Sequence, residues 1–213
     1  AEMKTVALKI QQAVFFVAIA ALWFGCSNSV REIVDEWAIY RRERMVNLKI
    51  PCYLASKFAV LGIFCFIQCL CLFTIVTYFC DLATPMLWLL PILFLVAMVG
   101  VGIGLTISSI ARTSEVALGV LPLVILPMVL LGGLVSPVHD LGAAEPLAHL
   151  VPSRWAYEAK LLLEAEYQEE GKTIDPETNK QVPFDIAEAH FPEDDERMGV
   201  TAAVLAIIIS FIL

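Results

Sequence analysis

Charged residues are few in this chain of 213 residues: lysine, arginine, aspartate and glutamate make up 17% of it and are confined to a few blocks. The runs between these blocks carry almost no charge. Because about 20 residues of helix cross a hydrocarbon core about 30 Å thick, such runs predict transmembrane segments. They also lack the strict apolar–polar alternation of membrane-spanning β-strands. The sequence therefore predicts an all-α polytopic membrane protein.

We predict membrane spans at residues 6–26, 52–80, 86–110, 116–135 and 199–213, within a single domain at residues 1–213. The last run has about three-quarters of the length that a span needs. The chain also begins with alanine rather than methionine. From these two features we expect a fragment of a longer polypeptide.

Patterns that carry catalysis or ligand chemistry are also lacking. The sequence has no phosphate-binding loop, no nucleophile–base pair and no paired carboxylates within the apolar runs, so a self-contained enzyme has little support. All six cysteines lie in or beside the apolar runs, where thiols act as small hydrophobes, and we expect neither a disulfide framework nor a metal site. Two minor metal-site alternatives stay open. They would use Cys65, Cys69 and Cys71, or the histidines among the acidic residues, His139, His149 and His190.

Basic residues predict the orientation in the membrane. The loop at residues 27–50 is rich in arginine, and the short loop after residue 110 carries Arg112, which places both on the cytoplasmic side by the positive-inside rule. The loop at residues 81–85 has one acid and no base, which suits the outer side. The acidic loop at residues 136–198 is then also outside. We expect its first part to form re-entrant or interfacial helices, with a helix capped by Ser153 that runs to Tyr167, and residues 168–197 to form an exposed acidic surface.

The polar segment between the first two spans predicts a short helix at the membrane surface. Ser29 and Glu32 have the spacing of a capping box. Apolar residues then recur at helical spacing on one face, and Arg31 is placed to pair with Asp35 one turn later. Glu32 and Glu36 are like charges one turn apart. Either an external basic partner balances them, or this face is an ordinary solvated surface.

Four features within the spans predict packing. Gln68 lies in the middle of the second span, where it bonds to another helix or lines a wet path, whereas Lys57 is near the end and is expected to extend to the interface. The third span repeats small residues at one-turn spacing, which is typical of a close helix-packing face. The fourth contains two prolines, which favour a kink beside a cavity or a moving part. The small residues of the third span are Gly100, Gly104 and Ser108, and the prolines of the fourth span are Pro122 and Pro127.

Four strings in register carry a resemblance to a known family. FGCSNSVREIVDEWAIYRRER is followed by YLASKF and later by GGLVSP and LVPSRWAYEA. Together they resemble the membrane domain of G-subfamily ABC transporters, which are half-transporters with the type-2 exporter permease fold. The resemblance covers nearly the whole chain. It implies that the chain corresponds to five of six transmembrane helices, the second to the sixth.

The resemblance also implies partners and residue roles. An ATPase domain that binds ATP and magnesium would lie upstream on the same polypeptide, and the loop after the first span would be the coupling helix that docks on it. A second half-transporter, the same or different, would complete a dimer with a substrate cavity between the subunits. The implied coupling residues are Glu32, Glu36, Trp37 and Glu43.

Further residues are implied for the substrate path. Phe24 matches an aromatic that contacts substrate, Phe16 is the other aromatic of the first span that we expect to face a ligand path, and Pro122 and Leu126 match the cavity face of the family's fifth helix. The outer plug would consist of Leu134 and Val135. The two prolines in that helix depart from the family pattern, and the absence of cysteines from the outer loop suggests a bacterial member.

The sequence thus predicts the membrane part of an ATP-driven exporter of lipids or other hydrophobic or amphipathic compounds. We expect it in the cell membrane, in contact with lipid and without a nucleic-acid partner, and in the inner membrane if it is bacterial. One alternative is a scaffold that docks a partner on the acidic outer loop. Another is a membrane-embedded hydrolase that uses the outer histidines and acids.

Overall fold

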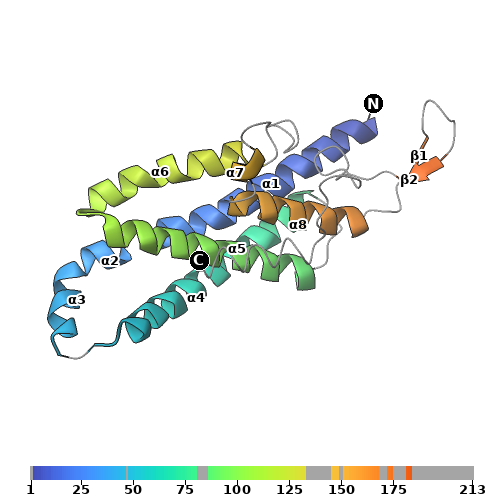
Figure 1. Cartoon of the computed structure of the whole chain (residues 1–213). Helices are drawn as coiled ribbons and strands as arrows, with labels where there is room; N and C mark the ends of the chain where they lie inside the picture. The colour runs from blue at the N-terminus through green and yellow to red at the C-terminus, as the bar shows by residue number, and fades with distance from the viewer. Residues whose placement is uncertain are drawn as a thin grey trace.

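The structure, a computed structural model, describes residues 2–46, 48–80, 86–132, 145–148, 151–167, 172–174 and 181–183. These residues form a helical bundle with one small hairpin (Figure 1). The helices are α1 (Glu2–Ser29), α2 (Glu32–Asp35), α3 (Trp37–Arg44), α4 (Ile50–Cys80), α5 (Met86–Ile110), α6 (Ser114–Leu130), α7 (Glu145–Ala148) and α8 (Pro152–Tyr167). The strands are β1 (Lys172–Ile174) and β2 (Gln181–Pro183), which pair antiparallel.

The long helices coincide with four of the five predicted spans. Within the described residues, three helical stretches are long and apolar enough to cross a membrane: Gln11–Asp35, Ile50–Phe79 and Trp88–Ile110. Helix α6 is apolar but has only 17 residues, and it continues through both of its prolines. The fifth predicted span, at residues 199–213, lies outside the described residues.

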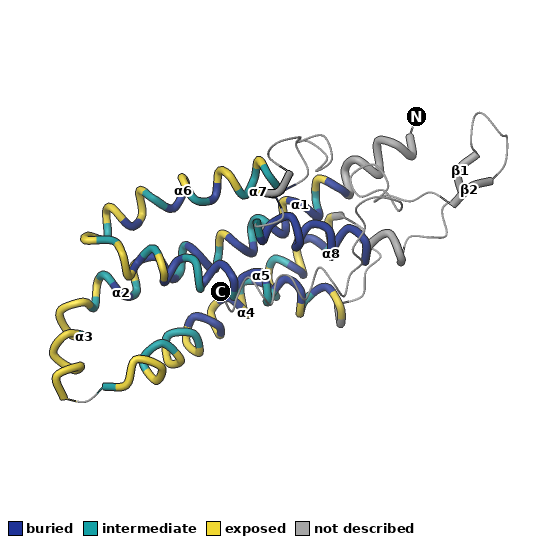
Figure 2. The backbone as a smooth tube through the Cα atoms, viewed as in Figure 1, coloured by how far each residue is buried: buried dark blue, intermediate teal, exposed yellow. Residues whose placement is uncertain are grey.

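Helices α1 and α5 form the centre of the bundle. They make the most extensive contact in the described chain, and α4, α6 and α8 each pack against both of them. Most positions of α1 and α5 are buried or half-buried, whereas α4 and α6 keep long exposed faces (Figure 2). Those exposed faces are apolar, as expected for side chains that meet lipid or another subunit rather than water.

The predicted small-residue face brings the backbones of α1 and α5 together. A β-carbon at Gly100 would lie 2.3 Å from the carbonyl oxygen of Leu22, and one at Gly25 would lie 1.9 Å from that of Ala97. At Gly104 it would meet the Ser29 hydroxyl at 2.0 Å. Only residues without a side chain permit this approach, so the predicted close-packing face is confirmed and its partner is α1.

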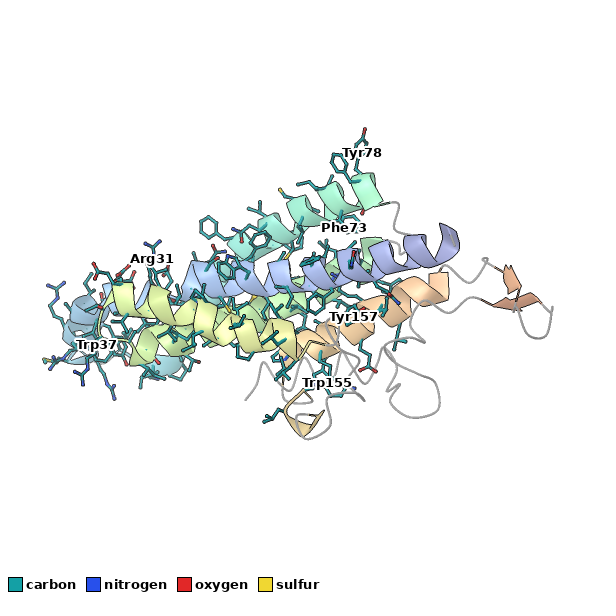
Figure 3. The ribbon with its side chains drawn as sticks, turned by 90° about the horizontal axis from the view of Figure 1, so that it is seen from above. Arg31, Trp37, Phe73, Tyr78, Trp155 and Tyr157 are labelled. Carbon is teal, nitrogen blue, oxygen red and sulfur yellow. The ribbon has the colours of Figure 1, made fainter. Side chains whose placement is uncertain are left out.

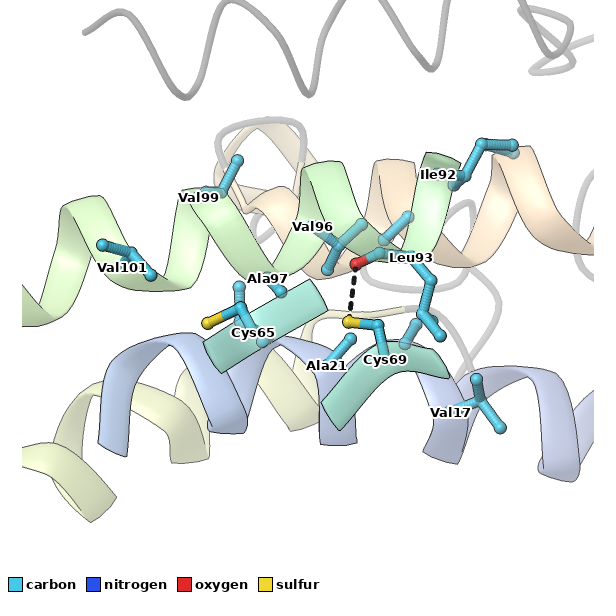
Figure 4. Packing of buried hydrophobic residues seen from close by; sticks show 14 of the residues in the cluster. Val17, Ala21, Cys65, Cys69, Ile92, Leu93, Val96, Ala97, Val99 and Val101 are labelled. Carbon is cyan, nitrogen blue, oxygen red and sulfur yellow. Dashed lines mark hydrogen bonds between the residues drawn. The ribbon is translucent and has the colours of Figure 1, made fainter. Parts of the chain in front are cut away.

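Two cysteines of α4 fill the groove between α1 and α5. Cys65 and Cys69 are fully buried, and the Cys69 thiol points to the carbonyl oxygen of Leu93 at 3.7 Å (Figure 4). Cys71 lies on the exposed face of the same helix. The three thiols therefore do not converge, and the cysteine metal site is wrong. Across the described residues, no group of three or more possible metal ligands occurs.

Helix α8 confirms the predicted helix that ends at Tyr167 but corrects its start. Pro152 is the first residue, a position where its missing N–H costs nothing, and Ser153 lies inside the helix with its hydroxyl donating to the carbonyl oxygen of Met128 at 2.6 Å. The helix is buried along residues 152–163, and Trp155 and Tyr157 lie within it (Figure 3). Buried Arg154 pairs with Glu158 at 3.3 Å.

The rest of the loop that we predict to lie outside, residues 136–198, is described only in part. The hairpin of β1 and β2 lies within the stretch that we expected to be an exposed acidic loop. The predicted plug residues, Leu134 and Val135, and the three histidines lie outside the described residues. The re-entrant arrangement therefore stays a prediction.

Candidate functional site

Helices α2 and α3 form one end of the bundle, beyond the end of α1. Figure 3 shows Arg31 and Trp37 at this end and Tyr78 at the opposite one. The predicted single helix is divided, because α2 ends at Asp35 and α3 begins at Trp37. Ser29 is still part of α1, where its hydroxyl donates to the carbonyl oxygen of Gly25 at 2.7 Å. The predicted capping box is therefore wrong.

The cap of α2 comes from another helix. The Ser108 hydroxyl of α5 accepts hydrogen bonds from the backbone N–H groups of Ile33 and Val34, both at 3.0 Å. These N–H groups would otherwise lack a partner at the start of the helix. Because Ser108 is buried, this pair of bonds fixes α2 on α5.

Lys57 of α4 balances the two acidic residues of the segment. Its ammonium lies 2.8 Å from a carboxylate oxygen of Glu32 and 2.6 Å from one of Glu36. The basic partner, which the sequence offered as one of two alternatives and placed outside the chain, is thus within the chain. Lys57 forms these ion pairs, whereas the sequence predicted that its side chain extends to the membrane interface. One cation between two carboxylates removes the repulsion that their spacing creates.

An aromatic series continues this contact along α3 and α4. The rings of Trp37 and Tyr40 are stacked with centroids 5.7 Å apart, and Tyr40 lies 5.0 Å from Tyr53 of α4. The Tyr53 hydroxyl donates to Glu36 at 3.4 Å, and the Lys57 ammonium lies 5.7 Å from the Tyr53 ring. Charged and aromatic contacts therefore join α3 to α4.

A third contact joins α2 to α6. Asp35, which the sequence predicts to pair with Arg31, accepts a hydrogen bond from the Ser114 hydroxyl at the start of α6. Within the described residues no ion pair joins Arg31 and Asp35. This contact also places the loop that carries Arg112 beside α2, so the two loops predicted to be cytoplasmic lie at the same end.

Glu43, the remaining predicted coupling residue, is exposed near the end of α3. Three arginines of the same helix surround it in sequence, Arg41, Arg42 and Arg44, and all are exposed. The site thus has an inner side fixed to α4, α5 and α6, and a charged outer side open to a partner.

Behind α3 lies a cavity of about 560 Å³. Its walls come from α2, α3, α4, α5 and one residue of α6, and they are mostly apolar and aromatic. The lining includes Trp37, Tyr53, Phe58, Gly102, Thr106 and Val124.

The predicted substrate residues do not line this cavity. Phe16 and Leu126 are 61% and 57% exposed, Pro122 is exposed, and Phe24 is half-buried. They lie on outer faces of α1 and α6 in the single subunit.

Gln68 has its partner on α1. The Asn28 side-chain amide donates to the Gln68 carbonyl oxygen at 2.7 Å, which confirms bonding between helices. The sequence pattern did not predict this role of Asn28, nor the roles of Ser108 and Tyr53. Ser108 carried a signal, because it continues the small-residue repeat to the end of α5, but nothing in its spacing distinguishes a cap from a packing residue.

Comparison with known proteins agrees with this architecture. Residues 3–164 match the family described as ABC-2 type transporter. The chain belongs to this family. It is also 24% identical, over 156 residues, to the ABC transporter ATP-binding/permease protein Rv1747 of Mycobacterium tuberculosis. That match covers 70% of this chain and 18% of the relative, so the chain spans less than a fifth of the relative's length.

Membership of this family accounts for the long apolar helices of the molecule. This chain is an ABC-2 permease domain, a membrane component of an ABC transporter, and its apolar helices fit that role. The family assignment agrees with the sequence prediction of a type-2 ABC permease.

Proposed function

We propose that this permease domain couples ATP hydrolysis to export through α2 and α3, as part of a G-subfamily type half-transporter. The observation that carries the proposal is the threefold attachment of this segment. Lys57 ties it to α4, Ser108 to α5 and Ser114 to α6. A force on the exposed side of α3 would therefore move three membrane helices together.

The ATPase domain would lie beyond the described helices and would act on α3. The Mycobacterium tuberculosis relative is named as an ATP-binding and permease protein, which supports an ATPase domain on the same polypeptide here as well. That domain would supply ATP and magnesium and would contact Glu43 and the exposed Arg42 beside it. Glu32 and Glu36 would act in transmission rather than docking, because Lys57 already pairs with both.

Two copies would form the transport path. The exposed aromatic and proline faces at Phe16 and Pro122 are apolar surfaces that a second half-transporter would cover. The cargo would then meet apolar and aromatic side chains, which favours lipids or amphipathic organic compounds. The plug at Leu134 and Val135 would open outward when the ATPase domains close.

The test uses the full-length protein with its ATPase domain, in lipid nanodiscs. A cysteine is introduced at Phe16, and its maleimide labelling is measured above the background of the native cysteines, with and without ATP and vanadate. We expect trapping of the closed ATPase to change this labelling severalfold. Glu43→Gln should reduce the change while ATP hydrolysis continues, because the nucleotide site itself is untouched.

Glu115→Gln is the matched control. Glu115 is an exposed acid in the first turn of α6, at the same end of the bundle. It should leave the labelling change intact. Equal responses in the Glu43→Gln and Glu115→Gln proteins would remove Glu43 from coupling, and labelling that is indifferent to vanadate would refute ATP-driven motion of α1.

A further inference from the structure

Two hollows meet at the aromatic residues of α3. Trp37 and Tyr40 line the 560 Å³ cavity on one side. The same two side chains line a second hollow of about 380 Å³, whose other walls are Arg41, Arg44 and Met45. An apolar space and a basic surface are therefore adjacent, with the stacked aromatic pair between them.

The two hollows have opposite chemistry. Within the larger one, aliphatic and aromatic side chains predominate, with the hydroxyls of Thr106 and Ser109 at its wall. The smaller one presents two guanidinium groups. One of them, on Arg44, donates to the Tyr40 hydroxyl at 3.4 Å, which holds it at the rim. This combination fits a molecule with an apolar tail and an anionic head.

We propose that this site binds one anionic phospholipid of the cytoplasmic leaflet, with an acyl chain in the 560 Å³ cavity and its phosphate on Arg41 and Arg44. Guanidinium groups bind phosphate through paired, charge-assisted hydrogen bonds. Basic groups between membrane helices on the cytoplasmic side are suited to anionic lipid heads.

The local charge supports an anion. Helix α3 carries three arginines and one acid, Glu43. The other nearby acids are Glu32 and Glu36, which are paired with Lys57 and so oppose the arginines less, and Asp35, which accepts a hydrogen bond from Ser114 on the side of α6. The rim therefore stays positive on the side that faces the hollow.

The position relative to the membrane also fits. Tryptophan and tyrosine rings favour the head-group level of a bilayer, where Trp37 and Tyr40 would lie. The neighbouring apolar side chains of Ile39, Met45 and Val46 are exposed, between 48% and 83%. Because α3 carries arginines and lies among exposed apolar residues, its composition is that of a helix at the membrane interface.

The head-group test uses native mass spectrometry of the full-length protein from nanodiscs that contain phosphatidylcholine and phosphatidylglycerol in equal amounts. The wild type should retain one phosphatidylglycerol in preference to phosphatidylcholine. The Arg41→Gln/Arg44→Gln protein should lose about fivefold in this preference for each arginine removed. Arg42→Gln removes an exposed arginine of the same helix that lines neither hollow, and it should keep the preference.

The acyl-chain test fills the cavity from α5. Gly102 lines the cavity, and a β-carbon there meets nothing within 4 Å, so Gly102→Leu introduces a side chain at the cavity wall without a clash at its β-carbon. It should release the retained lipid. Gly119→Leu is the control, since Gly119 of α6 is equally open but lies outside the lining.

Three outcomes would overturn the proposal. The wild type could show no preference for phosphatidylglycerol. Arg42→Gln could lower the preference as much as the double substitution, which would indicate diffuse surface charge. Gly102→Leu could retain lipid as well as Gly119→Leu does, which would exclude an acyl chain from the cavity or show that another segment of the protein fills it.

Discussion

Substituting Gly100 with alanine tests the central contact of the bundle. The new methyl group would lie 2.3 Å from the carbonyl oxygen of Leu22 and 3.1 Å from the backbone nitrogen of Cys26. Carbon–oxygen contacts between helices are ordinarily about 3.3–3.6 Å, so α1 and α5 would have to separate by about 1 Å. Because the obstructing atoms belong to a backbone, no side-chain rotation relieves the contact.

The magnitude follows from two opposing effects. Overpacking of this kind costs about 1–3 kcal/mol, and the rigid backbone places Gly100→Ala at the upper end of that range. Alanine in a helix regains about 1 kcal/mol over glycine. We therefore expect a net loss of about 2 kcal/mol in the free energy of unfolding.

Gly102→Ala is the matched control on the same helix. A β-carbon at Gly102 meets nothing within 4 Å, so only the gain of about 1 kcal/mol applies. The two variants should thus differ by about 3 kcal/mol. Unfolding of the full-length protein in detergent micelles, followed by circular dichroism or by loss of the monodisperse peak, measures this difference. If Gly100→Ala is as stable as Gly102→Ala, α1 and α5 are not in backbone contact and the packing argument is wrong.

Further substitutions test other contacts. Ser108→Ala should cost about 1 kcal/mol by removing the cap of α2, whereas Ser109→Ala, on the exposed face, should be nearly neutral in the same unfolding assay. Lys57→Met should cost about 1 kcal/mol, since its partners are partly exposed, and adding Glu32→Gln should recover a few tenths if the loss comes from carboxylate repulsion. Burial lowers the pKa of Lys160 on α8 to about 7, so the folded state is neutral where the unfolded state is protonated. Between about pH 7 and pH 10 the wild type should gain about 1.4 kcal/mol per pH unit relative to Lys160→Met, and a difference that does not vary with pH would exclude this burial.

The sequence determined where the long helices lie because length and apolarity suffice for that decision. Residues 86–110 were predicted as a span and form α5 with the same bounds. The small-residue repeat on α5 was equally readable, since a face of glycines has few uses other than close packing. The order of the motifs predicted the membrane domain of an ABC transporter, and the match of residues 3–164 to the ABC-2 type transporter family agrees with that broader assignment.

Only the tertiary structure decided which side chains cap the helices and which charged groups pair. Ser29 and Glu32 have the spacing of a capping box, but α1 continues through Ser29, and Ser108, 75 residues away from Ile33, takes the cap. Lys57 looked like an interfacial lysine because the sequence does not show that α4 returns beside α2. Local patterns fix helices through contacts three and four residues apart, whereas charge pairing and capping at this end depend on how separate helices pack. That dependence is why the position of the α2–α3 segment was predictable from the sequence and its attachments to the other helices were not.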